Sequence, residues 1–284
     1  MIPSARAIRW GMWLSGHLPA GVLRGAARLV GHVAWSMAPG RRHVIATNME
    51  YLVADPTARA QRGHRVLPNM LEAATDLWRL PSLDGPGLDR LVDSRGLEHL
   101  DAAIAAGQGV ILATAHLGPY ELAGAWLAHR GYAVHAMVER MPEETGAALA
   151  AYRSSTGMQL LDRSSGPRGL LRVLKAGDVA ALVCDRMVGA GAPGQVVPFG
   201  QGFREIPVGP ASFAISTGAR VVTGSIVRHP VGPWRYQLTL DPPVDPRAHT
   251  VATLTAHIGA RLSAMAVAHA DEWYVFQPAW RDER

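Results

Sequence analysis

Residues 108–124 read Gln-Gly-Val-Ile-Leu-Ala-Thr-Ala-His-Leu-Gly-Pro-Tyr-Glu-Leu-Ala-Gly, and the fold follows from this stretch. The apolar, partly β-branched run 110–115 predicts a buried strand. Residues 118–119, Gly-Pro, turn the chain, and the small and apolar residues that follow predict a helix. His116 is therefore expected at the C-terminal end of a strand, with Glu121 five residues later in the first turn of a helix.

The rest of the chain supplies the layers around this stretch. Strands are predicted at 109–115, 132–138, 179–185, 219–227 and 234–240, and helices at 97–106, 119–129, 143–156, 166–176, 209–217 and 249–270. Strands separated by helices imply parallel βαβ units, so we predict an α/β fold with a mostly parallel central sheet flanked by helices. Residues 41–82 should also be helical but are too few and too apolar to fold alone. We therefore predict a single domain over residues 1–284.

A histidine and a carboxylate in this arrangement suit base catalysis. A neutral imidazole can accept the proton that a hydroxyl loses as it attacks. Glu121 is expected to accept a hydrogen bond from the other ring nitrogen of His116, which would fix the tautomer and stabilise the imidazolium. No serine or cysteine lies nearby in a nucleophile setting, which favours direct attack by a bound acceptor. The structural alternative is a strand-end histidine followed by a glutamate that simply favours a helix N-terminus.

A second motif accompanies the first. The C-terminal residues 271–280 read Asp-Glu-Trp-Tyr-Val-Phe-Gln-Pro-Ala-Trp. Together with His116-Leu-Gly-Pro-Tyr-Glu121 after an apolar strand, this stretch resembles the lipid A biosynthesis acyltransferase family. The similarity is greater to its actinobacterial branch, the phosphatidylinositol mannoside acyltransferases, and it extends from about Arg41 to Trp280.

The resemblance implies a glycerolipid acyltransferase-like fold and a reaction. Family members transfer a fatty acyl group from an acyl thioester to a hydroxyl of a glycolipid at the cytoplasmic face of the cell membrane. His116 would be the general base, with Glu121 as its carboxylate partner. Further family positions map onto the candidate substrate-binding residues Glu139, Arg140, Arg153, Asp185, Arg186, Gln195 and Gln201. Arg204 and Glu205 complete the candidates, Arg204 as one of a group of arginines of which some are expected to face phosphates of a thioester carrier or lipid head group.

The chain departs from the branch in one region. Carboxylates usually flank a Phe-Gly pair there, whereas Gln195 and Gln201 stand at those places in this chain. Glu205 is one candidate to replace the lost carboxylate. Alternatively, the acceptor differs from a phosphatidylinositol mannoside and the glutamines recognise something neutral. The segment 200–207 lacks helix or strand periodicity, so we predict a loop.

The N-terminal 49 residues are basic, with six arginines and no acidic residue. Val22, Ala26, Val30 and Val33 recur at helical spacing, so the segment predicts an amphipathic helix lying in the plane of an anionic membrane surface. The arginines interrupt every apolar run before it reaches about 18 residues, which argues against a spanning helix. The alternative is a helix that docks on the domain's own core.

Composition limits the partners. The formal net charge of +5 favours an anionic partner, and Lys175 is the only lysine, so the positive charge is almost entirely guanidinium. The histidines show no metal-binding spacing, and neither a metal nor a bound cofactor is expected. Residues 189–194 match G-x-G-x-x-G but do not open a helix, so a loop beside the active site is predicted and not a dinucleotide site. Cys184 lies in an apolar run and is expected to be a buried core thiol.

These observations predict an acyl-CoA-dependent O-acyltransferase, peripheral on the cytoplasmic membrane face. Its partners would be acyl-CoA or an acyl carrier protein and anionic lipids, with no nucleic acid. The acyl chain is expected in an apolar groove near Leu117, Trp126 and Phe213. Two alternatives stay open, namely the same chemistry on a soluble specialised metabolite and a non-catalytic lipid-binding protein of the same fold.

Overall fold

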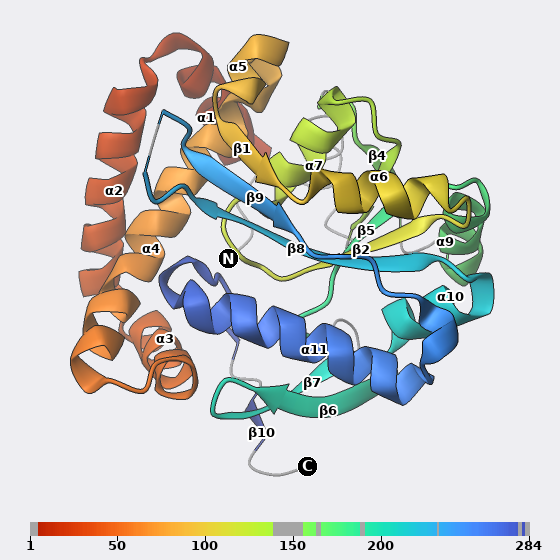
Figure 1. The fold of residues 1–284 in the computed structure, drawn as a ribbon. Helices are drawn as coiled ribbons and strands as arrows, with labels where there is room; N and C mark the ends of the chain where they lie inside the picture. Colours follow the sequence, from red (N-terminus) through yellow and green to blue (C-terminus); the bar gives the residue numbers. More distant parts are fainter. Residues whose placement is uncertain are drawn as a thin grey trace.

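The computed structural model describes residues 5–138, 156–162, 166–187, 191–231, 233–277 and 280–281. At its centre lies a seven-stranded sheet in the order β1-β9-β8-β2-β5-β3-β4 (Figure 1). Its strands are β1 (Val92–Arg95), β2 (Val110–Thr114), β3 (Val134–Val138), β4 (Gln159–Asp162), β5 (Val179–Val183), β8 (Arg220–Arg228) and β9 (Tyr236–Leu240). Every neighbouring pair is parallel except β8 with β9. The predicted α/β fold with a mostly parallel sheet is confirmed.

Helices cover both faces of this sheet (Figure 1). One face carries α5 (Gly85–Asp89), α6 (Leu97–Ala105) and α7 (Tyr120–His129), and the other carries α9 (Gly166–Lys175), α10 (Gly209–Thr217) and α11 (Val251–Ala268). In β2, Val110 and Leu112 join the apolar cluster with α6 and α7, whereas Ile111 and Ala113 join the cluster with α9, α10 and α11. Successive strand residues point to opposite faces, so a strand covered on both sides must be apolar throughout.

A second, smaller sheet lies beside α11. Its antiparallel strands are β6 (Gly194–Phe199), β7 (Gly202–Pro207) and β10 (Trp280–Arg281), in the order β10-β7-β6. The approach of α11 is close, because a Cβ added to Gly259 would lie 2.7 Å from Cγ2 of Val197. The predicted loop at 200–207 is therefore wrong. Gly200, with φ +57°, turns the chain so that β7 pairs with β6, and that partner is invisible to the periodicity of one segment.

Four helices precede the sheet, namely α1 (Ala5–His17), α2 (Ala20–Met37), α3 (Pro39–Leu52) and α4 (Pro56–Arg79). Helix α2 runs along α4 (Figure 1), and Gly31 allows the contact because a Cβ there would lie 2.4 Å from Cα of Pro68. The apolar stripe predicted for this helix faces the other way, with Val22 59% and Val30 56% exposed. Helix α2 docks on α4, but not through the stripe.

Other sequence predictions have mixed outcomes. Cys184 is buried as predicted, and burial raises the pKa of its thiol. Most of the predicted helix 143–156 lies outside the described residues. Within the described part of the chain, α11 is the one helix long and apolar enough to cross a membrane by length and composition, yet it contacts both β6 and β8.

Candidate active site

The parallel pairing of β2 with β5 brings His116 and Asp185 together. Thr114 lies opposite Val183 in the register, and each strand is followed two residues later by one member of the pair. Nδ1 of His116 lies 2.6 Å from Oδ1 of Asp185, and the backbone N–H of His116 donates to Oδ2 at 3.0 Å. The pair lies at the carboxyl ends of adjacent strands, which is where open α/β sheets bind ligands.

Asp185 is held in its ionised form. Its side chain is fully buried, and Nε1 of Trp273 donates to Oδ2 at 2.8 Å. Burial by itself would raise the pKa of Asp185, but the neighbouring His116 and the hydrogen bonds from His116 and Trp273 lower it to about 2. An ionised carboxylate only accepts hydrogen bonds, so Nδ1 of His116 carries the proton.

The second ring nitrogen of His116 is consequently an acceptor. Nε of Arg186 donates to it at 3.3 Å, and the histidine side chain keeps 16% of its surface exposed. The ring of Tyr120 meets the imidazole edge-on, with the ring centroids 5.5 Å apart. The imidazole thus has a fixed tautomer with its basic nitrogen directed at a guanidinium.

The predicted pairing of Glu121 with the imidazole is wrong in this structure, because Asp185 and Arg186 take the two ring nitrogens. Gly118, with φ +56°, turns the chain so sharply that α7 begins at Tyr120. Glu121, in the first turn of that helix, lines an internal cavity between α7 and the sheet.

That cavity is mostly apolar and begins next to the His116 loop. Thr114, Tyr120 and Glu121 line it close in sequence to His116. The remaining lining residues are Leu112, Ala123, Gly124, Ala136, Met137, Met158, Ala181, Val183, Gly224, Ser225, Ile226, Leu238 and Leu240. The lining expected from the sequence was different, since Leu117, Trp126 and Phe213 are not part of it. Trp126 instead packs into the core and donates through Nε1 to Asp89.

Arg204, another of the predicted substrate-binding residues, has none of its surface exposed. Its Nε donates to the backbone carbonyl of Asp185 at 3.3 Å, and its guanidinium lies 4.9 Å from the ring centroid of Trp273 and 5.0 Å from that of Trp280. Burial lowers the pKa of Arg204 to about 10. Arg204 is therefore not placed to bind a substrate, because β7 directs it into the core, where it supports the Asp185 turn.

The remaining residues of the β6–β7 region do not pair with the imidazole. Gln195 donates to the carbonyl of Ala252 at 3.1 Å, and Gln201 is exposed at the turn between the strands. Glu205 forms an ion pair of 2.6 Å with Arg281. The other predicted substrate-binding residues, Glu139, Arg140 and Arg153, lie outside the described residues.

One contributor was missed at the sequence level. Trp273 lies in the second quoted motif, yet nothing in one sequence assigns it the hydrogen bond to Asp185. Its backbone also forms an antiparallel bridge with Leu117 in the His116 loop. No group of three or more metal-ligating side chains occurs in the part of the chain that the structure describes.

Comparisons with known proteins identify relatives of this chain. A family model for "Bacterial lipid A biosynthesis acyltransferase" matches residues 6–282. The phosphatidylinositol mannoside acyltransferase of Mycobacterium tuberculosis is 34% identical over 213 residues, covering 72% of this chain and 66% of that protein. That of Mycolicibacterium smegmatis is 29% identical over 215 residues, covering 72% and 67%.

A solved structure is also similar, that of the 1-acyl-sn-glycerophosphate acyltransferase PlsC from Thermotoga maritima. The TM-score is 0.41 at 14% identity, over 80% of this chain and 96% of the other. The chain spans about two thirds of the length of the mycobacterial relatives.

Proposed function

Because the chain belongs to the bacterial lipid A biosynthesis acyltransferase family, we propose that this acyltransferase moves a fatty acyl group from acyl-CoA to a sugar hydroxyl of a glycolipid. A phosphatidylinositol mannoside is the acceptor we favour, since the mycobacterial relatives carry that name. The observation that carries the proposal is the His116–Asp185 pair beside an apolar cavity.

His116 acts as the general base in this proposal. Nε2 takes the proton of the acceptor hydroxyl while the oxygen attacks the thioester carbonyl, and Asp185 stabilises the imidazolium that forms. The tetrahedral intermediate collapses to the new ester, and the proton on Nε2 passes to the departing thiolate of coenzyme A. No covalent enzyme intermediate is needed.

Arg186 is a charged donor within reach of this chemistry. Its Nε–H already meets Nε2 of His116 at 3.3 Å. When the hydroxyl of the acceptor replaces Arg186 as the hydrogen-bond donor to Nε2, the thioester carbonyl that it attacks lies beside the guanidinium. A cation there opposes the negative charge that develops on the carbonyl oxygen in the transition state.

The cavity beneath α7, about 80 Å³ in volume, takes the part of the acyl chain next to the thioester. Its lining is mostly aliphatic side chains, methionines and glycines, and burying a methylene group against such a surface contributes about 0.8 kcal/mol. Thr114, Tyr120 and Glu121 lie at the end nearest the catalytic loop, where a thioester carbonyl would be presented to His116.

The N-terminal helices seat the protein on the membrane. On α2, Leu29 is 65% and Val33 49% exposed, and on α1, Trp10 is 63% exposed. Apolar side chains exposed along helices with arginines nearby fit an anionic lipid surface better than water. We place this surface at the cytoplasmic face, bound peripherally, where acyl-CoA or an acyl carrier protein delivers the chain.

The test uses purified protein, acyl-CoA and phosphatidylinositol mannoside in anionic vesicles. Release of free CoA and acylation of the lipid, followed by mass spectrometry, should both fall about 10²–10⁴-fold in His116→Ala. His129→Ala is the matched control, because His129 ends α7 and is exposed. Unchanged turnover in His116→Ala would overturn the proposal. Transfer to a soluble acceptor alone would favour the metabolite alternative, and binding without turnover would favour a lipid-binding protein.

A further inference from the structure

The segment 272–274 touches both members of the catalytic pair. The backbone N–H of Tyr274 donates to the carbonyl of His116 at 2.8 Å, and the N–H of Gly118 donates to the carbonyl of Glu272 at 2.8 Å. Between them, Trp273 donates to Asp185 at 2.8 Å. The position of this segment therefore determines where the base and its aspartate lie.

Glu272 is the anchor of the segment. Its side chain is buried, and both carboxylate oxygens accept from the backbone N–H of Arg228, at 3.1 and 3.2 Å. Arg228 ends β8, and the catalytic loop packs on this part of the strand. A Cβ on Gly118 would lie only 2.0 Å from the carbonyl oxygen of Ile226. The loop is thus confined between the end of β8 and the Glu272 backbone.

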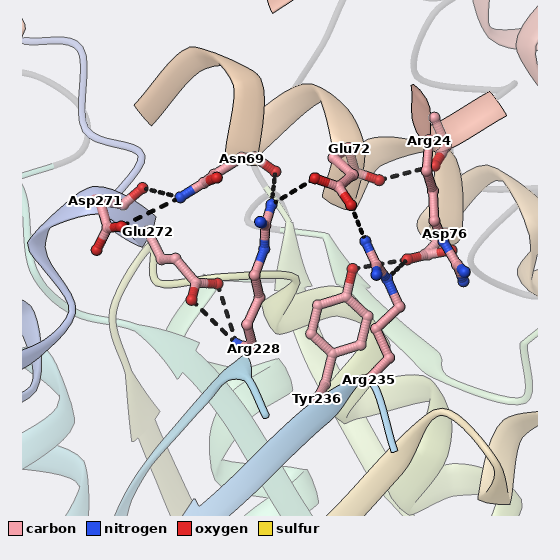
Figure 2. Close-up of polar contacts among 10 residues, drawn as sticks. Arg24, Asn69, Glu72, Asp76, Arg228, Arg235, Tyr236, Asp271 and Glu272 are labelled. Carbon is pink, nitrogen blue, oxygen red and sulfur yellow. Dashed lines mark hydrogen bonds and ion pairs between the residues drawn. The ribbon is translucent and has the colours of Figure 1, made fainter. Parts of the chain in front are cut away.

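A network of charged residues extends from the contact between Glu272 and Arg228, as Figure 2 shows. The guanidinium of Arg228 pairs with Glu72 of α4 at 3.1 Å and donates to the carbonyl of Asn69 at 3.3 Å. Asn69 donates in turn to the carbonyl of Asp271 at 3.0 Å. Helix α4 therefore holds both ends of the contact between Glu272 and Arg228.

The network continues to the outermost helix. Arg235 bridges Glu72 and Asp76, and its Nε lies 2.7 Å from Oδ2 of Asp76. Arg24 of α2 donates to Oδ1 of the same aspartate at 2.6 and 2.8 Å. The carboxylates of Glu72 and Asp76 are buried, and ion pairs to buried carboxylates are screened less by water than exposed pairs are.

We propose that Glu272 is a positioning residue for acyl transfer, which clamps the His116 loop to the end of β8 and so fixes the contact between His116 and Asp185. The inference rests on the proposed function, but Glu272 itself does not touch the reacting atoms. Glu272 reaches the imidazole only through backbone hydrogen bonds and Trp273.

Two substitutions test the clamp. Glu272→Gln keeps an oxygen that accepts from the N–H of Arg228, whereas Glu272→Ala removes it. We expect kcat to fall about 10–100-fold in Glu272→Ala with KM for acyl-CoA within about threefold, and Glu272→Gln to recover most of the loss. Asp245→Ala is the matched control, because Asp245 pairs with Arg220 at the opposite end of β8.

Two further measurements separate positioning from general stability. If Glu272 acts through His116, the double variant His116→Ala/Glu272→Ala should lose no more activity than His116→Ala alone, because the losses would not multiply. Amide hydrogen exchange at Gly118 and Tyr274 should quicken at least about tenfold in Glu272→Ala and stay near wild type in Glu272→Gln.

The exchange measurement does not depend on turnover. Unchanged amide protection in a folded Glu272→Ala, or losses that multiply in the double variant, would overturn the positioning role. If the wild-type protein fails to acylate any lipid, that result counts against the proposed function alone, and the exchange rates still decide whether Glu272 holds the loop.

Discussion

Asp185→Asn should nearly abolish activity while leaving the fold intact. Both oxygens of Asp185 accept hydrogen bonds, Oδ1 from Nδ1 of His116 and Oδ2 from the His116 backbone N–H and Nε1 of Trp273. An asparagine has one acceptor oxygen. Placed at Oδ2 it satisfies two donors, and its NH₂ group then faces Nδ1.

The consequence is a change of tautomer. The amide donates to Nδ1, the proton moves to Nε2, and the nitrogen that should accept the hydroxyl proton no longer can. In a histidine–aspartate pair of this kind the wrong tautomer lowers kcat about 10⁴-fold, and each tenfold step is about 1.36 kcal/mol of barrier. We therefore expect a loss of about 10³–10⁴-fold, or about 4 to 5.5 kcal/mol.

The assay is CoA release at saturating acyl-CoA, with circular dichroism to confirm folding. The structure offers a matched control in Asp178→Asn, because Asp178 pairs with His135 at 2.8 Å, elsewhere in the same sheet. That variant should keep near-normal kcat. The reasoning is refuted if Asp185→Asn stays within tenfold of wild type, since Asp185 would then not be needed to orient the base.

Four other variants give further tests. Glu121→Gln should reduce kcat far less than Asp185→Asn, and Glu205→Gln, which alters only the pair with Arg281, should stay within about tenfold of wild type in the same assay. Leu29→Asp, on the exposed stripe of α2, should weaken flotation with anionic vesicles, and wild-type binding should fall as salt screens the arginines. Burial raises the pKa of Glu272 from 4.5 to about 7, so between these pH values the folded state keeps a proton that the unfolded state has released. The free energy of unfolding, measured with urea and compared with that of Glu272→Gln, should therefore drop by about 3 kcal/mol from pH 4.5 to pH 7 and level off above. A pH-independent difference would contradict this.

The sequence singled out His116 as the candidate base but not Asp185 as its hydrogen-bond partner, for a topological reason. His116 was located because an apolar strand, a turn and a helix are local signals. Asp185 also follows a predicted strand, but it pairs with His116 only because β5 lies beside β2 in the sheet. Periodicity identifies strands and leaves their order open, so the nearest carboxylate in sequence, Glu121, was the natural and incorrect choice.

The same limit explains the strands that were missed. β1 and β4 are four-residue edge strands with polar positions, and β7 alternates a buried Arg204 with a partly exposed Glu205. An arginine facing a core contradicts the usual pattern of apolar residues inside. Arg204 can be buried because its guanidinium packs against the rings of Trp273 and Trp280, which lie about 70 residues later in the chain.

The sequence of α2 predicts an amphipathic helix, but it does not predict which face of that helix packs on the rest of the protein. An amphipathic helix in a globular protein normally turns its apolar stripe inward and its charges to water. Here Arg24 points inward to Asp76, while Val22 and Val30 point outward. Two hydrogen bonds from Arg24 to one oxygen of the buried Asp76 carboxylate, together with the close approach at Gly31, hold the helix on α4 without contacts from the stripe. The stripe is thereby left exposed, as the proposed membrane contact requires, and the arginine that anchors the helix belongs to the same network that holds Glu272.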